Sequence, residues 1–306
     1  MIRYIMKRLF QTLLVLILVS MLTFLLVRLA PGNPARMMLP ETASDEAVRE
    51  MEIKMGLDRP IYEQYIMYVG DILHGDFGTS SVYRAPVTSV VATRLPHTLL
   101  LASASIIVGC CLCIPLGIIA GSNQGKPIDF FAILFALFGQ SMSHVWLAVL
   151  NVFMFAVWLG WLPALGSNGL QSLILPALSL GYPMAAEITR IGRSGMIDTL
   201  REDYITATYA RGMSRTEVNW KYAFKNALIP IITLIGIQFG SFLSGTVVVE
   251  TVFAWPGIGQ LMYQAISNRD YSLVQGLVLL SAFFFAIINL IVDLINSFID
   301  PRIVLE

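Results

Sequence analysis

The chain has 306 residues, of which 56% are hydrophobic and only 13% are charged. Its mean hydropathy of +0.72 is far above that of a soluble domain, so the composition indicates a membrane protein. The 20 lysine and arginine residues balance the 20 aspartate and glutamate residues, so the net charge of zero gives no indication of a nucleic-acid partner.

Six long, mostly apolar windows predict six membrane-spanning helices. They lie at about Leu9–Leu29, Leu99–Gly121, Phe130–Leu162, Leu173–Thr189, Leu228–Val249 and Leu273–Ile295. The third window is too long for one perpendicular span at about 1.5 Å per residue, so part of it is expected to tilt or to lie outside the membrane. The windows therefore predict an all-α, polytopic membrane protein.

The first window follows Arg3, Lys7 and Arg8, as the apolar run of a secretory signal peptide would. No small-residue cleavage site stands out in it, and it is long enough to span a bilayer of about 30 Å. We therefore interpret residues 1–30 as a cytoplasmic tail followed by a retained first span.

The basic residues near the windows predict the orientation of the spans. With a cytoplasmic N-terminus, six spans return the C-terminus to the same side and place the basic segment 190–227 inside as well. Residues 31–97 then form an extracytoplasmic cap, and residues 98–306 form a core of five helices. The cap holds six lysine or arginine residues, but a loop of this length is expected to translocate regardless of charge.

Neither a metal site nor a nucleotide site is indicated. All three cysteines lie inside one apolar window, where thiols usually serve as small packing groups, and no histidine lies in that window. The segment GSNQGKP (Gly121–Pro127) spaces its glycines wrongly for a phosphate loop and has Pro127 where serine or threonine should bind Mg²⁺. The chain is therefore not expected to be an enzyme, and energy for any transport must come from elsewhere.

The segment REDYITATYARGMSRTEV (Arg201–Val218) is a polar interruption between two apolar windows, and it predicts two short helices around a sharp turn. Gly212 is placed to take the left-handed conformation that ends a helix. Ser214 follows as N-cap with Glu217 three residues later, which is a capping box. Met213 and the valine that ends the segment are placed to pack as a hydrophobic staple.

This loop has two interpretations. Amphipathic helices between spans can lie on the membrane surface, but the first helix lacks the bulky apolar face that a surface anchor needs. Its small and polar side chains suit a helix that enters a groove on another protein; they include Thr206, Ala207, Thr208 and Ala210. We therefore expect a partner protein to grip the loop.

The segment EDYITATYARGMSRTEVNWKYAFKNALIP (Glu202–Pro230) resembles the cytoplasmic loop of permease subunits in ATP-binding cassette importers of the dipeptide, oligopeptide and nickel branch. Similar stretches occur in order along the chain: RLAPGNPA, GLDRPIYEQY, GDFGTS, RLPHTLLL, VVVETVFAWPGIGQL, NRDYSLVQ and NLIVDLINSFIDPRI. The resemblance implies that the loop forms the coupling helix, which docks into an ATPase subunit. The broader importer pattern has Glu-Ala-Ala where this chain has Thr206-Ala207-Thr208, so the role of that glutamate does not transfer. The residues implied in coupling are Tyr204, Thr206, Ala207, Thr208, Ala210, Arg211, Gly212, Met213, Ser214 and Glu217.

The resemblance also implies an assembly and a location. The chain would pair with a homologous second permease, two ATPase subunits and an extracytoplasmic solute-binding protein, in the plasma membrane of a bacterium or archaeon. ATP and Mg²⁺ would be used by the partner subunits. The expected cargo is a di- or oligopeptide, while nickel, glutathione or another small solute stays open, because selection in such importers resides largely in the binding protein.

Polar residues inside the windows are candidates for the translocation pathway. Gln140, Ser141 and His144 form a polar patch in the third window, and Gln238 and Ser241 lie in the fifth. The alternative is that these side chains join neighbouring helices by hydrogen bonds.

Ionisable groups inside the windows would favour a different class, a secondary transporter driven by protons or sodium. Glu187 lies one turn from Arg190, so we expect a paired group at the cytoplasmic boundary and no clearly central charge. A purely structural membrane subunit is a third possibility, but it does not explain a gripped loop.

On the outer side, the end of the fifth window is broken by a proline and a glycine before a short amphipathic segment. One interpretation is an interfacial helix with Trp255 and Tyr263 as aromatic anchors. The resemblance adds a contact surface for the binding protein, with the candidate residues Trp255, Pro256, Gly257 and Gln260.

Overall fold

The computed structural model describes residues 2–29, 35–36, 39, 42–54, 56–167, 169–244 and 246–299. Over these ranges the chain is all-α, with no β-strand and one isolated bridge that joins Thr79 to Pro86. The predicted all-α class is therefore confirmed.

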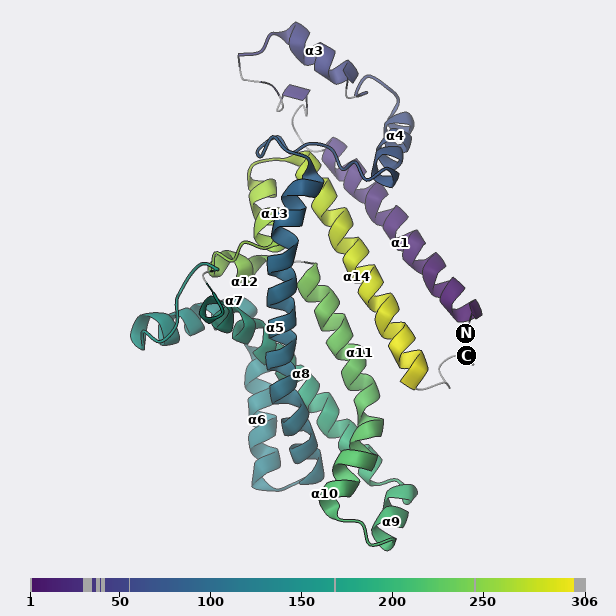
Figure 1. Cartoon of the computed structure of the whole chain (residues 1–306), viewed down its shortest axis with the longest axis vertical. Coiled ribbons are helices and arrows are strands. Elements are labelled where there is room, and N and C mark those ends of the chain that lie inside the picture. The colour runs from purple at the N-terminus through teal and green to yellow at the C-terminus, as the bar shows by residue number, and fades with distance from the viewer. Residues whose placement is uncertain are drawn as a thin grey trace.

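Long helices form the body of an elongated molecule, and short helices lie at both of its ends and beside its middle (Figure 1). The long helices are α1 (Ile2–Leu29), α5 (Val87–Ser122), α6 (Pro127–Ser141), α8 (Gln171–Leu200), α11 (Phe224–Leu243) and α14 (Tyr271–Ile299). The short helices on the side of the cap are α3 (Asp45–Lys54), α4 (Ile61–Leu73), α12 (Val247–Val252) and α13 (Ile258–Ser267). The remaining elements are α7 (His144–Asn151), α9 (Asp203–Ala210), α10 (Arg215–Glu217) and two π-helical segments, η1 (Val152–Trp158) and η2 (Val218–Ala223).

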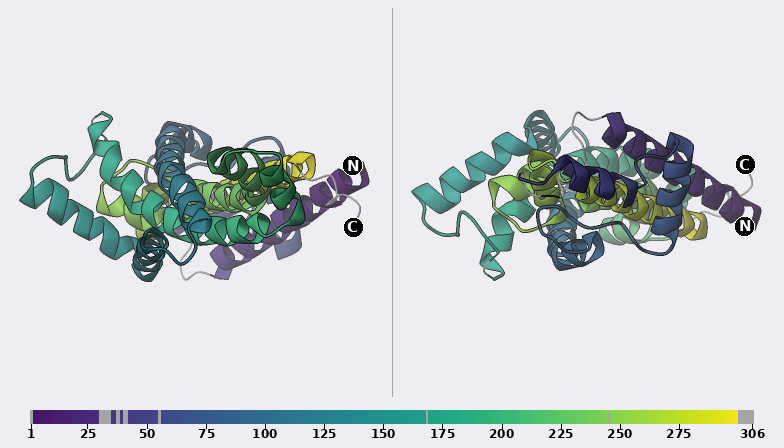
Figure 2. Two further views of the ribbon diagram at one scale, coloured as in Figure 1. Left: turned by 90° about the horizontal axis from the view of Figure 1, so that it is seen from below. Right: turned by 90° about the horizontal axis from the view of Figure 1, so that it is seen from above.

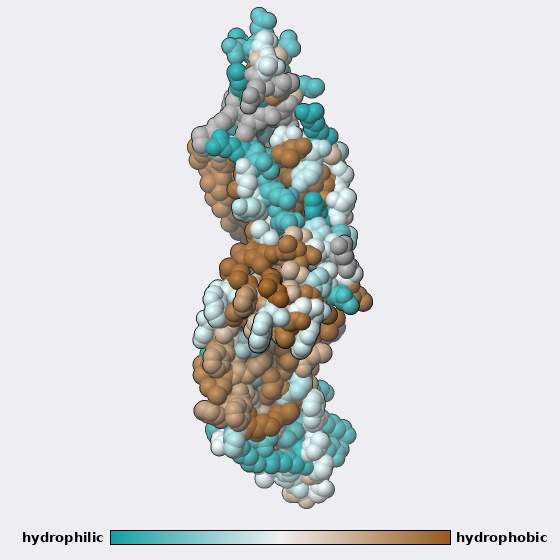
Figure 3. Space-filling view, turned by 90° about the vertical axis from the view of Figure 1, so that its left-hand side faces the viewer, coloured by the Kyte–Doolittle hydropathy of each residue, from teal (hydrophilic) through white to brown (hydrophobic). Residues whose placement is uncertain are grey.

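Among the described residues, four helical stretches are long and apolar enough to cross a membrane, and a fifth is possible if the bent pair around residues 142–143 counts as one span. The four are Met6–Leu29, Val87–Ser122, Arg215–Leu243 and Tyr271–Asn296. Hydrophobic side chains gather over the middle of the molecular face in Figure 3, and hydrophilic ones gather at its two ends. This distribution is typical of a protein that crosses a bilayer.

The third apolar window is one bent element. α6 ends at Ser141, and the chain bends by 103° before the α7–η1 pair. Ser143 has extended backbone and its hydroxyl accepts a hydrogen bond from the Trp146 backbone N–H at 3.3 Å, which starts α7 as an N-cap. The bend accounts for the excess length of the window, and the α7–η1 pair projects sideways from the bundle (Figure 2).

α8 runs through the interior of the bundle, where it packs against α5, α6 and α11. Its approach to α5 is close, because a Cβ at Gly181 would lie 2.7 Å from the backbone oxygen of Ser105. The sequence predicts a span that ends at Thr189, whereas the helix continues to Leu200. Glu187 therefore lies about midway along α8.

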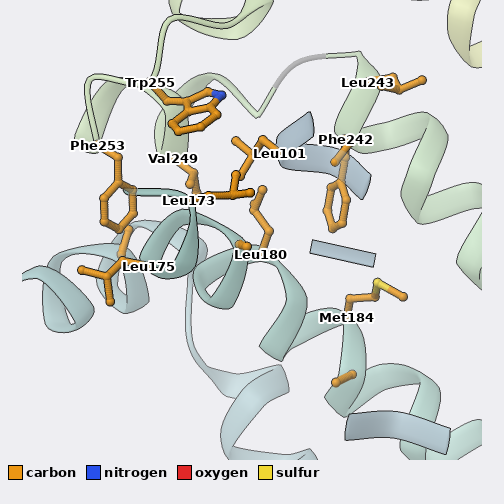
Figure 4. Close-up of a cluster of buried hydrophobic side chains, with 14 of the residues drawn as sticks. Leu101, Leu173, Leu175, Leu180, Met184, Phe242, Leu243, Val249, Phe253 and Trp255 are labelled. Carbon is orange, nitrogen blue, oxygen red and sulfur yellow. The ribbon is translucent and has the colours of Figure 1, made fainter. Parts of the chain in front are cut away.

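The main hydrophobic core lies where α5, α8, α11 and α12 meet (Figure 4). Leu180 and Met184 of α8 point toward Phe242 of α11, and Trp255 closes the core from the loop that follows α12. All four side chains are buried. The core joins helices that are distant in sequence and so fixes the framework around the polar groups described below.

α1 lies on the outside of the bundle, along α14 (Figure 1). Arg8 Nε and an Asp293 carboxylate oxygen form an ion pair at 3.1 Å between the two helices. The cap is held to α1 through α4, since the hydroxyls of Ser20 and Tyr65 are hydrogen-bonded at 2.9 Å and the Tyr65 ring meets Phe24 edge-on. Tyr65 of α4 thus anchors this part of the cap to α1.

Candidate functional site

The polar loop between α8 and α11 forms the predicted helix, turn and helix. Gly212 adopts φ +80°, and its N–H donates to the Tyr209 carbonyl oxygen at 2.9 Å, so the glycine ends α9 as expected. The Ser214 hydroxyl accepts from the Glu217 N–H at 3.3 Å and starts α10. The Glu217 carboxylate pairs with Lys221 Nζ at 3.6 Å, so the half of the predicted capping box that is formed is the Ser214 hydroxyl bond.

Apolar side chains fasten the loop to the long helices. Met213 and Val218, the predicted staple, both belong to a cluster with Ile205 of α9, Ile118 of α5 and Met196 of α8. Val218 and Met196 are completely buried, and Ile205 is nearly so. A movement of the loop must therefore move the ends of α5 and α8 with it, because a packed cluster transmits displacement.

Polar contacts reinforce the same junction. An Arg215 guanidinium N–H donates to the Ser122 carbonyl oxygen at the end of α5. The Tyr204 hydroxyl of α9 is hydrogen-bonded to the Asn226 amide of α11 at 2.5 Å. The loop is thus held at both of its short helices.

A two-pronged ion pair joins α6 to α8 near this junction. Arg193 Nε and Nη2 donate to the two carboxylate oxygens of Asp129 at 2.5 and 2.8 Å. The Gly125 N–H donates to the same carboxylate at 2.9 Å, and Asp129 is buried. Because the guanidinium and the carboxylate form two parallel hydrogen bonds, this contact restricts the relative movement of α6 and α8.

Most of the residues predicted for coupling are exposed, as a docking surface requires; they are Tyr204, Thr206, Ala207, Ala210, Arg211, Gly212, Ser214 and Glu217. Met213 is half-buried. Thr208 is only 5% exposed, and its hydroxyl donates to the Ile205 carbonyl oxygen at 2.7 Å, so its placement on the docking surface is wrong. Sequence reasoning missed Tyr209 and Trp220, whose rings are exposed on this loop; aromatic residues in a polar segment were the available signal.

A second group of polar residues lines a cavity of about 180 Å³ between the α6–α7 bend, α8 and α11. Gln140, His144 and Gln238, three of the predicted pathway residues, lie in its wall together with Glu187. Gln238 Nε2 donates to a Glu187 carboxylate oxygen at 2.8 Å. The cavity therefore brings together polar groups from four helices, α6, α7, α8 and α11.

The two predicted pathway serines are not in the wall of this cavity. Ser141 and Ser241 are both exposed, and the Ser141 hydroxyl donates to the Leu137 carbonyl oxygen within its own helix. This bond satisfies the Ser141 hydroxyl within its own helix. Neither Ser141 nor Ser241 is among the residues that line the cavity.

Glu187 does not form the pair with Arg190 that the sequence predicts. Its carboxylate accepts a hydrogen bond from the Gln238 amide, and no ion pair between Glu187 and Arg190 occurs among the described side chains. Arg190 is exposed, whereas Glu187 is half-buried within the bundle. The predicted pairing fails because the Glu187 side chain meets Gln238 of α11.

The outer candidates divide into surface and interior residues. Trp255 is only 2% exposed, and its indole N–H donates to the His97 carbonyl oxygen at 2.9 Å. Gly257 is buried, and a Cβ there would lie 2.4 Å from the Glu250 carboxyl group. The assignment of both residues to a contact surface, and of Trp255 as a membrane anchor, is therefore wrong. Pro256 and Gln260 are half-buried and keep some accessible surface.

Glu250 holds this outer corner together. It is completely buried in α12, outside the candidate spans, and it accepts hydrogen bonds from the Thr98 hydroxyl at 3.1 Å and the Gln260 N–H at 2.9 Å. Burial raises the pKa of Glu250, although these hydrogen bonds act in the opposite direction. The carboxyl group thus joins α5, α12 and α13.

Comparisons with known proteins agree along the whole length. The family of binding-protein-dependent transport system inner membrane components matches residues 113–305, and the N-terminal membrane component of the same systems matches residues 1–102. A solved structure of the MetNI methionine ABC transporter in an inward-facing conformation aligns with a TM-score of 0.55 at 17% identity, over 70% of this chain and 97% of that chain. The structural likeness shows a shared fold.

Two full-length relatives are more similar in sequence. The dipeptide transport system permease protein DppB of Alkalihalophilus pseudofirmus is 37% identical over 331 residues, and the alignment covers 99% of each chain. The glutathione transport system permease protein GsiC of Escherichia coli (strain K12) is 38% identical over 303 residues, again over 99% of each chain. The chain therefore belongs to the family of binding-protein-dependent transport system inner membrane components, as a permease subunit of an ATP-binding cassette importer whose ATPase activity resides in separate subunits.

Proposed function

We propose that this chain forms half of the translocation pathway of an importer for di- or oligopeptides. Its partners are a homologous second permease, two ATPase subunits that use ATP and Mg²⁺, and an extracytoplasmic binding protein, in the inner membrane of a bacterium or archaeon. The observation that carries the proposal is the loop between α8 and α11, which is exposed on one side and packed onto α5 and α8 on the other. The names of the dipeptide and glutathione relatives support the peptide cargo.

The proposed topology has six spans and cytoplasmic termini. The sixth span is α8, which is not among the four apolar stretches but lies inside the bundle, where a helix faces protein and tolerates polar residues. In Figure 1 the start of α1 and the end of α14 lie toward the same side of the molecule, as an even number of spans requires. Basic residues in the α8–α11 loop favour a cytoplasmic location for that loop.

The proposed mechanism is mechanical coupling. When the ATPase subunits close, they displace α9 and α10 together. The cluster around Val218 and the Arg215–Ser122 hydrogen bond pass this displacement to α5 and α8, and the Asp129–Arg193 pair carries it to α6. The cavity at the α6–α7 bend lies among the same helices, so its opening changes with the state of the ATPases.

The binding protein is proposed to meet the cap and the loop ends beside it. Tyr83 is exposed in this region, and its hydroxyl donates to the Gln264 amide oxygen of α13 at 3.0 Å. Asp270 is buried and accepts from the Ser80 hydroxyl at 2.5 Å, which fastens the cap to the start of α14. Together with Pro256 and Gln260, this outer surface is firmly positioned.

The test is to purify the affinity-tagged chain from its native membrane in mild detergent and to identify its companions by mass spectrometry. Recovery of a second permease and ATPase subunits is expected. The same complex, reconstituted in liposomes with its binding protein, is expected to import peptide only when ATP and Mg²⁺ are supplied on the ATPase side. A chain that purifies alone and carries solute without ATPase would instead identify a secondary transporter.

The cargo is tested with the same liposomes. Uptake is measured for a labelled dipeptide, an oligopeptide, glutathione and Ni²⁺ at equal concentration. Preferential uptake of the peptides supports the proposal. Uptake of Ni²⁺ or glutathione alone would replace the cargo and leave the importer assignment in place.

A further inference from the structure

The cavity at the α6–α7 bend contains a carboxylate that the coupling mechanism does not use. Glu187 lies about midway along α8, roughly 20 Å from the C-terminal end of that helix at about 1.5 Å per residue. It is the acidic residue among those that line the cavity, and the other walls include the apolar side chains of Leu180, Met184 and Phe242. A carboxylate beside such apolar side chains is costly to ionise, and its presence points to a ligand.

The contacts of Glu187 within the chain leave its charge without a described counter-charge. One carboxylate oxygen accepts from Gln238 Nε2, which is a neutral donor. No lysine or arginine lines the cavity, and none forms an ion pair with Glu187 among the described residues. A neutral amide compensates a carboxylate only in part, so the site is suited to a cation.

The neighbouring groups narrow the kind of cation. Gln140 and His144 lie at the exposed mouth, and they add an amide oxygen and a ring nitrogen that can accept hydrogen bonds. No group of three or more metal-binding side chains occurs in the part of the chain that the structure describes. An ammonium group has several N–H donors and fits one carboxylate with neutral acceptors better than a divalent metal ion does.

The size of the cavity fits part of a solute. At about 180 Å³ it is smaller than pockets that enclose a whole small ligand, which are typically about 300–1,000 Å³. We propose that Glu187, Gln238, Gln140 and His144 form a transient site for the primary ammonium group of the transported solute, such as the free amino terminus of a peptide. This inference rests on the proposed function, because it identifies the part of the cargo that this permease binds.

The test compares two probes that differ only in the ammonium group. The purified complex with its ATPase subunits, without the binding protein, is placed in lipid nanodiscs and titrated with alanyl-alanine or with N-acetyl-alanyl-alanine. Binding is followed by saturation-transfer difference NMR, which detects weak ligands. Alanyl-alanine is expected to reach half-saturation at a concentration at least tenfold lower than the acetylated probe.

Three variants connect that difference to the cavity. Glu187→Gln is expected to weaken alanyl-alanine binding at least tenfold and to leave the acetylated probe unchanged, while Glu187→Asp keeps part of the preference. Asp198→Asn is the matched control, because it removes an exposed carboxylate from the same helix and is expected to change neither titration. Recovery of the ATPase subunits with each variant shows that it has folded and assembled.

The outcomes separate this inference from the proposed function. Equal binding of the two probes, no binding of either, or an assembled Glu187→Gln variant with wild-type titrations would overturn the ammonium site. In each of these cases an ATP-dependent complex that imports peptide would still support the importer. Failure to recover ATPase subunits with the wild-type chain would instead overturn the proposed function.

Discussion

Gly212 offers a sharp test of the coupling loop, because its backbone is left-handed and its surroundings are open. It has φ +80°, and a Cβ added there would meet no atom within 4 Å. A substitution therefore acts through backbone strain and not through a clash. The left-handed conformation costs a residue with a Cβ about 1–2 kcal/mol, and valine, being β-branched, is expected at the upper end.

The expected effect is a loss of affinity for the ATPase subunits. If docking requires the turn that Gly212 permits, about 1 kcal/mol weakens binding roughly fivefold in Gly212→Ala, and about 2 kcal/mol weakens it roughly 30-fold in Gly212→Val. The affinity is measured by titrating purified ATPase subunits onto the permease pair in nanodiscs. Membrane insertion is expected to be unchanged, because Gly212 lies outside the helical stretches that are long and apolar enough to cross a membrane.

Gly75 provides the matched control. It has φ +81° and open surroundings, it follows α4 as Gly212 follows α9, and its N–H donates to Ile72 as that of Gly212 does to Tyr209. Gly75→Val therefore introduces the same strain in the cap and is expected to leave ATPase affinity unchanged. The reasoning is refuted if Gly212→Val binds like the wild type, or if both valine variants lose affinity equally.

Three further predictions concern the loop, the buried ion pair and the outer corner. Ala207→Trp replaces a small exposed side chain on the docking surface and is expected to reduce copurified ATPase at least tenfold with little change in melting temperature, whereas wild-type recovery would contradict the groove interpretation. Asp129→Asn leaves Arg193 without its two-pronged partner and is expected to destabilise the permease by about 3 kcal/mol, read as a lower melting temperature in detergent; an unchanged melting temperature would argue against the pair. Glu250→Gln turns one acceptor that faces a backbone N–H into a donor and is expected to lower the melting temperature. The pKa of Glu250 is higher in the folded than in the unfolded state, so its contribution to stability is complete below the unfolded-state pKa and is lost as the pH rises through the folded-state pKa. The difference in melting temperature between the wild type and Glu250→Gln should therefore shrink as the pH is raised. A difference that stays constant with pH would contradict this.

Local sequence signals were sufficient for the coupling turn. The conformation of Gly212 and the N-cap at Ser214 depend on a few neighbouring residues, and both are formed as predicted. The second half of the capping box, a bond from the Ser214 N–H to the Glu217 carboxylate, is not among the described contacts. Glu217 lies one turn before Lys221 on the same helical face and pairs with that lysine instead. Competition of this kind between local partners depends on which exposed rotamer is lower in energy.

Long-range contacts explain the predictions that failed. A tryptophan at the end of an apolar run looks the same in sequence whether it faces lipid headgroups or a backbone carbonyl, and Trp255 faces the carbonyl oxygen of His97. Glu187 and Gln238 meet only because α8 and α11 cross at that level. Periodicity identifies the helices, but it does not say which of their faces meet.

The packing of α1 against α14 has a consequence for biogenesis. These are the first and the last long helices along the described chain, and the ion pair between Arg8 and Asp293 connects them. During synthesis α1 enters the membrane long before α14 exists, so its place on the bundle is filled only when translation is nearly complete. A chain that stops before α14 would therefore leave α1 without its packing face and Arg8 without its Asp293 partner, so the α1 side of the bundle is completed only by the last described helix.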